Sequence, residues 1–175
     1  MKQKRILLYA VCAVGVAVLL LLSFSIIEIG IPECWIVKRE REKRGAPDSW
    51  AVMSAEEDGI FAVCFYDKAG ASCRFAVYTK HTNGIGYFFY TGGSVVSIDG
   101  TPGRTQIQRV RCRGTERLVL ISMNTEGVAR IAVQCGEVIE YIEVDAQYPF
   151  LYIAPVECKA ISLLDSAGHV LEAFP

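Results

Sequence analysis

The stretch "IFAVCFYDKAGASCRFAVYT", Ile60 to Thr79, decides the fold class. Two runs of β-branched and aromatic residues, 60–66 and 73–79, lie on either side of the sequence Asp-Lys-Ala-Gly. We expect Asp67 to cap the turn through its carboxylate, and Gly70 to take the left-handed position of a bulged type I turn. The stretch therefore predicts a tight antiparallel hairpin.

The same turn sequence recurs near the C-terminus as "DSAG", Asp165 to Gly168. Short strands with turn signals roughly every 8–12 residues are typical of a sandwich or barrel. We predict an all-β fold, a small antiparallel β-sandwich of immunoglobulin-like size over residues 58–175, preceded by a single N-terminal transmembrane helix. Besides the two runs above, strands are expected near 85–91, 105–112, 116–122, 128–134, 137–144, 150–153, 159–164 and 169–174.

The segment "GYFFYTGG", Gly86 to Gly93, has no polar face. Tyr87 and Phe89 should point to one side of a strand, and Phe88 and Tyr90 to the other. A sandwich strand buries only one face. Either the apolar segment 50–53 covers the second face, or an exposed aromatic patch there binds a partner.

The N-terminal region has a run of 22 uncharged residues, 6–27. As a helix it would extend roughly 33 Å, enough for a bilayer core. We predict a transmembrane anchor at residues 6–31, in contact with the lipid bilayer, after a basic flank at 1–5. A signal peptide cleaved near residues 23–25 is the alternative, but the apolar run continues past that site.

Basic residues on both sides of the anchor compete in setting its orientation. Lys2, Lys4 and Arg5 precede it, whereas the segment 38–44, "KREREKR", has five basic residues. The first group adjoins the helix, while the second starts further away and includes two glutamates. We therefore expect a single-pass protein of the cell membrane with an extracytoplasmic domain, joined by a charged linker at residues 32–57.

Charge excludes one class of partner and singles out one motif. Residues 45–175 have 10 Lys and Arg against 15 Asp and Glu, a net charge near −5. The domain therefore lacks the excess of positive charge that is typical of nucleic-acid binding. In "RVRCRG", Arg109, Arg111 and Arg113 alternate with smaller residues and would form a basic ribbon on one strand face. This ribbon either contacts anionic polymers or lipid headgroups, or pairs with the acidic strand at 137–145.

The chain has seven cysteines, six of them outside the apolar run. They form either a disulfide framework or a set of small reduced core residues. The bulged turn places Cys64 and Cys73 on opposite faces, so we expect no bridge between them and mainly reduced thiols. A metal site is not expected, because there is no Cys-x-x-Cys pair and His81 and His169 are isolated in the sequence. No motif indicates a cofactor.

Five segments stand out together: "GIFAVCFYD", "FAVYTKHTNGIGYFFYTGGS", "ISMNTEGVARI", "YPFLYI" and "LLDSAGHVLE". They resemble segments of a family of short uncharacterised proteins of Gram-positive bacteria, which have an N-terminal membrane helix and a small all-β domain. The resemblance covers about residues 58–174. It implies a membrane location and an all-β class, but no activity and no catalytic residues.

We therefore expect a membrane-anchored, non-catalytic extracytoplasmic module for binding or assembly at the cell surface. Its binding residues would be Tyr87, Phe88, Phe89 and Tyr90, together with Arg109, Arg111 and Arg113. The partner would be a protein or an anionic component of the cell envelope. The alternatives are a membrane-tethered regulator with a cytoplasmic domain, a secreted domain released by signal-peptide cleavage, and an enzyme with a dispersed Cys-His site.

Overall fold

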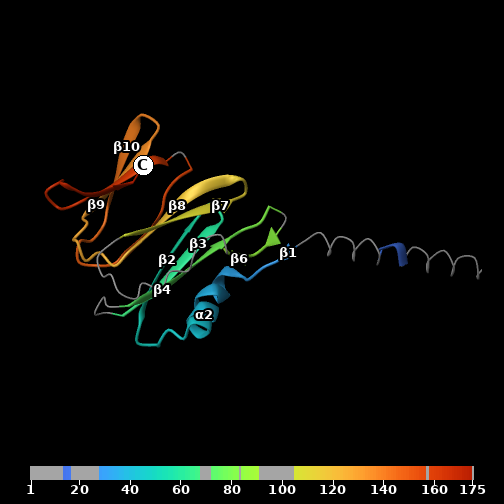
Figure 1. Ribbon diagram of the computed structural model, residues 1–175. Helices are drawn as coiled ribbons and strands as arrows, with labels where there is room; N and C mark the ends of the chain where they lie inside the picture. Colours follow the sequence, from blue (N-terminus) through green and yellow to red (C-terminus); the bar gives the residue numbers. More distant parts are fainter. Residues whose placement is uncertain are drawn as a thin grey trace, which may run out of the picture.

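The computed structural model describes residues 14–16, 28–67, 72–82, 84–90, 105–156 and 158–174 (Figure 1). Its elements are β1 (Glu28–Ile29), α2 (Glu33–Arg44), β2 (Ala51–Glu57), β3 (Ile60–Tyr66), β4 (Cys73–Thr79), β5 (Gly84–Ile85), β6 (Phe88–Phe89), β7 (Gln106–Cys112), β8 (Thr115–Ser122), β9 (Arg130–Cys135), β10 (Val138–Glu143), β11 (Phe150–Ile153), β12 (Cys158–Leu164) and β13 (Val170–Phe174). The predicted all-β class is confirmed, and β3, β4 and β11 have the predicted bounds.

Three antiparallel sheets account for most of the described strands. Their orders are β2-β3-β4-β6, β7-β8-β11 and β10-β9-β12-β13, and β1 pairs with β5 in parallel. The first two sheets share a core between Ile60, Ala62, Phe75 and Val77 on one side and residues of β7, β8 and β11, such as Val119, on the other. The other face of β8 and β11 packs on the third sheet through a second apolar cluster.

The hairpin β3–β4 is buried on both faces. Its second face, which includes Phe61, Phe65 and Tyr78, packs against helix α2 through Ile36 and against Tyr87. The sequence predicts a solvated linker at residues 32–57, but the structure places them in the domain, as α2 and as strand β2 paired along the whole of β3. The chain itself therefore covers the described part of the aromatic segment, residues 86–90. Helix α2 supplies most of this cover, and Trp50 packs against the same cluster.

Helix α2 begins after Pro32 and ends at Gly45, whose φ of 59° suits a glycine cap. Glu33 in its first turn and Arg41, Lys43 and Arg44 in its last match the helix dipole. Positively charged groups lie over the aromatic rings beneath the helix: Arg41 over Phe65 at 5.0 Å, and Lys43 over Phe89 at 4.5 Å. Cation–π contacts thus supplement the small apolar face of the helix.

Glu40 of α2 is fully buried at the centre of this contact. It accepts a hydrogen bond from the Tyr78 hydroxyl at 2.5 Å and another from Nε of Arg44 at 2.6 Å. Burial, and then the nearby Glu40 carboxylate, raise the pKa of Tyr78, so the hydroxyl stays a donor. A buried carboxylate satisfied in this way fixes where the helix lies on the sheet.

The two predicted turns have different outcomes. At the C-terminal one, the Asp165 carboxylate accepts hydrogen bonds from the Ala167 and His169 amides, both at 2.8 Å, and Gly168 has a φ of 87°. That prediction is confirmed.

The first turn is wider than predicted. Its strands end with Tyr66 opposite Cys73, and the Asp67 amide bonds to the Ser72 carbonyl; residues 68–71 lie outside the described residues. Because Cys64 pairs with Phe75, it shares a face with Cys73, so the prediction of opposite faces is wrong. The six described cysteines form no disulfide in the structure, and the expectation of mainly reduced thiols stays a prediction.

The predicted anchor falls mainly outside the described residues. Residues 14–16 are helical, whereas Glu28–Ile29 form strand β1 and the chain from 30 to 31 follows the segment 85–87. The helix therefore does not extend to residue 31 as predicted. Among the residues that the structure describes, no helix is both long and apolar enough to span a membrane.

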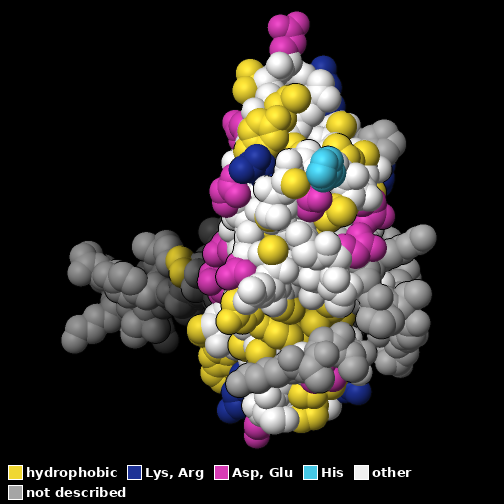
Figure 2. Space-filling view, turned by 90° about the vertical axis from the view of Figure 1, so that its left-hand side faces the viewer, with side chains coloured by type: hydrophobic (Ala, Val, Ile, Leu, Met, Phe, Trp, Pro, Cys, Tyr) yellow, Lys and Arg dark blue, Asp and Glu magenta, His cyan; other side chains and the backbone are white. Residues whose placement is uncertain are grey.

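The third sheet lies at the end of the molecule farthest from α2 (Figure 1). Its outer strands, β10 and β13, expose hydrophobic side chains: Val138, Ile139, Tyr141, Val170 and Leu171. Figure 2 shows hydrophobic side chains over the upper part of the face it presents, among acidic and basic ones.

We predict that Glu40→Ala lowers the free energy of unfolding by about 3 kcal/mol, because it removes the acceptor of two hydrogen bonds and leaves the Tyr78 hydroxyl buried without one. The measurement is urea unfolding of the full chain in detergent micelles, followed by tryptophan fluorescence. The control, Glu42→Ala, changes an exposed residue of the same helix and should cost less than about 0.5 kcal/mol. Equal effects would show that Glu40 does not hold the helix.

Candidate functional site

A cleft of about 550 Å³ lies between the ends of β4 and β6 and the turn that joins β7 to β8. Positively charged, imidazole and aromatic side chains predominate in its lining: Lys80, Arg111, Arg113, His81, Phe89 and Tyr90. This volume is within the usual range of ligand pockets, roughly 300–1,000 Å³. The structure therefore brings part of the predicted aromatic surface together with part of the predicted basic ribbon.

Tyr90 links the two sides of the cleft. Its amide donates to the Val77 carbonyl of β4 at 2.9 Å, and its hydroxyl accepts from the Arg111 amide of β7 at 3.3 Å. The ring packs against the core between the first two sheets. Because both contacts use the backbone of a strand, the Tyr90 ring holds the cleft walls at a fixed separation.

Arg113 lies in the turn rather than on the strand, contrary to the ribbon prediction. Cys112 pairs with Thr115, so Arg113 and Gly114 form a two-residue turn with φ of 51° and 83°. Its guanidinium carbon is 3.7 Å from the place a Cβ on Gly59 would occupy, so the side chain folds back over the β2–β3 turn. Arginine is uncommon in a left-handed conformation, which costs roughly 1–2 kcal/mol.

The positively charged groups differ in how far they are neutralised. Lys80 Nζ is 3.2 Å from Glu56 Oε1, and His81 Nδ1 is 2.5 Å from Glu28 Oε2. Within the described residues, the exposed guanidinium groups of Arg111 and Arg113 form no ion pair. Among the described residues, these two arginines therefore supply the positive charge of the cleft that has no acidic partner.

Tyr87 has a structural role beside the cleft. It is only 1 % exposed, and its hydroxyl donates to Glu56. This hydrogen bond is the main cause that lowers the pKa of Glu56, while burial and the same carboxylate raise the pKa of Tyr87 to about 12. Tyr87 is therefore not part of an exposed aromatic patch.

The other aromatic residues of the segment are half-buried. Phe88 stacks on the His81 ring at 4.1 Å, and Phe89 packs edge-on against Tyr78. Gly86, with a φ of 87°, lets the N-terminal segment approach, because a Cβ there would come within 2.9 Å of the Ile31 carbonyl oxygen. The segment is thus held on both sides by the chain itself, and only Phe89 and Tyr90 line the cleft.

Arg109 is exposed on β7 but does not line this cleft. Nη1 of Arg109 lies 3.2 Å from Glu116 on the neighbouring strand β8. The predicted ladder between the arginines and the acidic strand 137–145 is wrong, because β7 pairs with β8 and β10 pairs with β9. Glu143 of β10 contacts Arg130 instead.

Cys112 and His81 both line the cleft, which bears on the predicted Cys-His alternative. The Cys112 thiol is 4 % exposed and donates to the Gly59 and Lys80 carbonyls, both at 3.5 Å. The His81 ring contacts the Glu28 carboxylate through Nδ1 and stacks on Phe88. A buried thiol held by backbone carbonyls and a ring held by other partners do not make the contact between nucleophile and base that such a site needs.

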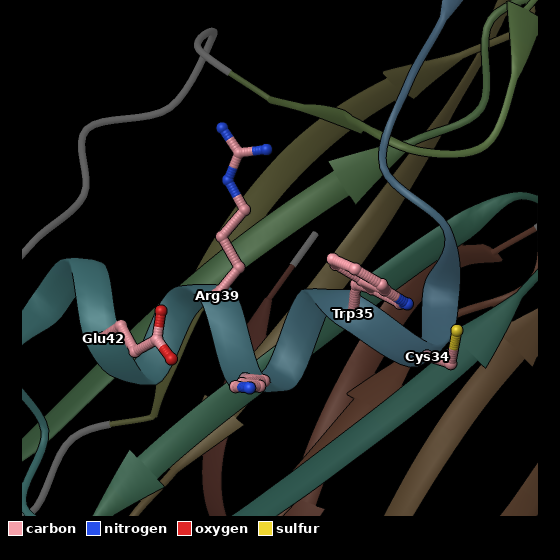
Figure 3. Close-up of a pocket in the computed structure, with 5 residues that line it drawn as sticks. Cys34, Trp35, Arg39 and Glu42 are labelled. Carbon is pink, nitrogen blue, oxygen red and sulfur yellow. The ribbon is translucent and has the colours of Figure 1, made fainter.

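A second hollow, of about 430 Å³, lies along the outer side of α2. Figure 3 shows Cys34, Trp35, Arg39 and Glu42 along the helix, and Lys38 completes the lining. Trp35 is 68 % exposed. An exposed indole beside two basic residues resembles the side chains that favour a membrane–water interface.

Comparisons with protein-family models, curated proteins and solved structures found no match to this chain. The resemblance to short Gram-positive membrane proteins therefore stays a prediction.

The sequence did not indicate Lys80 and His81 as residues of the binding site, although they directly follow a correctly predicted strand. It also missed the hairpin of β2 and β3, whose turn is Asp58-Gly59 with φ of 44° and 80°. An Asp-Gly dipeptide between two β-like runs is a recognised signal for such a turn. The preceding segment is rich in charged residues, and for this reason the sequence predicts a linker there and not a strand.

We predict that Arg113→Asn raises the free energy of unfolding by roughly 0.5–1 kcal/mol, because Asn adopts the left-handed conformation more readily and Asn-Gly suits this turn. Urea unfolding of the full chain in detergent micelles provides the measurement. Arg111→Asn, the same substitution on the strand, should not stabilise. If Arg113→Asn destabilises the chain, the Arg113 side chain contributes more to folding than its turn conformation costs.

Proposed function

We propose that this chain is a membrane-anchored binding module whose extracytoplasmic β-sandwich domain binds an anionic, phosphate-bearing polymer of the cell envelope. The observation that carries the proposal is a pair of exposed arginines, Arg111 and Arg113, which form no ion pair with any described residue and lie beside Phe89 and Tyr90 in one cleft. Guanidinium groups bind phosphate through paired hydrogen bonds. Aromatic rings suit the apolar parts of a polymer backbone.

The charge balance of the domain supports a local site rather than a general attraction. Residues 45–175 are acidic overall, with 10 Lys and Arg against 15 Asp and Glu. Exposed charges further apart than a Debye length, about 8 Å at physiological ionic strength, are largely screened. Affinity for an anion would therefore depend on the few charges in the cleft, and single substitutions there should have large effects.

Support for the anchor comes from the sequence and from α2. The uncharged run 6–27 is long enough to span a bilayer as a helix. Strand β1 is followed by α2, where Trp35, Lys38 and Arg39 line an open hollow. Such residues favour a position at the headgroup layer.

A second candidate is the membrane-tethered regulator with its domain in the cytoplasm. The observation in its favour is the five basic residues of the segment 38–44, which outnumber the three before the predicted anchor and favour the cytoplasmic side. The two candidates place the same domain on opposite sides of the membrane, so a topology measurement separates them.

For the binding site, we predict that Arg111→Ala weakens binding to poly(glycerol phosphate) about 10-fold, because a hydrogen bond to a charged group contributes roughly 1.5–3 kcal/mol. Binding is measured by isothermal titration calorimetry on the full chain in detergent micelles.

Arg109→Ala is the matched control, since it removes the same charge from the same strand but outside the cleft. It should change affinity less than about 2-fold. Equal losses of affinity in both variants would show that the ligand binds the basic surface of β7 as a whole and not the cleft. No binding by the wild type would reject the proposed ligand.

For topology, we predict that a Ser166→Cys variant on a Cys34→Ser background is labelled in intact cells by a membrane-impermeant maleimide. Ser166 is exposed in the closing turn, and Cys34 is the one exposed cysteine among the described residues. The Cys34→Ser chain alone is the control. Labelling only after the cells are opened would place the domain in the cytoplasm and favour the regulator.

A further inference from the structure

The third sheet places two cysteines opposite each other. Cys135 at the end of β9 and Cys158 at the start of β12 are partners in the register of adjacent antiparallel strands, beside an irregularity between Cys158 and Ala160. Both side chains pack against the same apolar cluster and so lie on the same side of the sheet, and the Cα atoms of paired residues are about 4.5–5.5 Å apart. This separation falls within the Cα–Cα range of disulfides, roughly 4.4–6.8 Å.

Electrostatic effects show the same proximity. Burial, and then the neighbouring Cys135, raise the pKa of the Cys158 thiol. Burial raises the pKa of Tyr152 to about 12, with both cysteines adding to the shift. All three residues pack at the edge of the same apolar cluster, so the two thiols belong to one small group of side chains.

The pair is accessible from one side. Both cysteines are half-buried, and Cys158 lines a cavity of about 410 Å³. Arg109, Arg117, Lys159 and Glu116 are among the described residues that line the same cavity. Arg109 is paired with Glu116 and Arg117 with Asp58, so the charge without an ion pair among the described lining residues is Lys159. A small reagent that reaches Cys158 passes this lysine, which favours an anionic reagent.

We propose that Cys135 and Cys158 form a cross-strand disulfide by exchange with a carboxylate-bearing, low-molecular-weight disulfide. The Cys158 thiolate attacks one sulfur of the external disulfide, whose S–S bond breaks, and the released thiolate takes up a proton. The Cys135 thiolate then attacks the Cys158 sulfur and releases the second external thiol. The two protein thiols lose two electrons and two protons, and one external disulfide is reduced to two thiols.

A second pair of cysteines in the chain lacks this access. Cys64 and Cys73 share a face of the first sheet but pair with Phe75 and Tyr66 respectively, so they are diagonal neighbours. They are 0 % and 3 % exposed within the core between two sheets. An external disulfide cannot reach them while the chain is folded, so the exchange is specific to the pair on β9 and β12.

The bond would connect the ends of β9 and β12 and close the loop that contains β10 and β11. It would therefore restrain the sheet that packs on the back of β8 through Ile131, Val133 and Ile161. The proposal does not rest on the anion-binding cleft, which lies at a different group of strands.

The test uses the full wild-type chain in detergent micelles, equilibrated with defined mixtures of reduced and oxidised glutathione. Thiols are trapped with N-ethylmaleimide and the chain is analysed by mass spectrometry. Trypsin leaves both cysteines in one peptide, 131–159, so a second cleavage after glutamate, at Glu137, Glu140 or Glu143, is needed to separate them. The expected result is a disulfide-linked peptide pair containing Cys135 and Cys158, with Cys64 and Cys73 unlinked.

The Cys34→Ser variant is the matched control, because it removes an exposed cysteine outside the sheet. It should keep the linked pair, whereas Cys135→Ser should lose it and leave Cys158 as a mixed disulfide with glutathione. Recovery of alkylated Cys135 and Cys158 from samples in which Cys34 is glutathionylated would overturn the proposal, as would a link from Cys158 to any other cysteine. If the serine variants fail to fold, the wild type and Cys34→Ser still decide between these results.

Discussion

The hairpin of β3 and β4 has no polar face, and both of its sides must be covered for the chain to fold. One side packs on the second sheet through residues such as Ala62, Val77 and Val119, and the other on α2 and Tyr87. At roughly 25 cal/mol per Å² of apolar surface, this double burial is the main favourable contribution to stability in the first half of the chain. The position of α2, of the aromatic segment and of the cleft all follow from it.

The cover supplied by α2 is chemically unusual. The helix has few apolar residues, and it binds the aromatic face through Ile36, the buried Glu40 carboxylate and positively charged groups over Phe65 and Phe89. Each cation–π contact contributes about 0.5–1 kcal/mol at exposed sites, and more where water is excluded. A helix of this kind depends on correct pairing with the sheet, because the buried carboxylate is tolerated only with its partners in place.

The cleft lies where three hairpin ends meet, and each contributes a different property. The β2–β3 turn provides a glycine over which Arg113 folds, the end of β4 provides Lys80 and His81, and the β7–β8 turn provides Arg113 itself. An arginine in a left-handed turn position has a local conformational cost, and such strained residues cluster at binding sites. Together with the charge of Arg111, which no described residue neutralises, this strain is the reason to locate a binding site here.

The sequence by itself determined the all-β class, most strands after residue 59 and the C-terminal turn, because alternation and turn chemistry act over a few neighbouring residues. Only the tertiary structure decided that 33–57 belong to the domain, that Tyr87 is buried, and that Arg111 and Arg113 lie beside Tyr90. It also decided the pairing of Cys135 with Cys158. These features depend on contacts between residues far apart in the chain, such as Tyr78 with Glu40, which no local pattern contains.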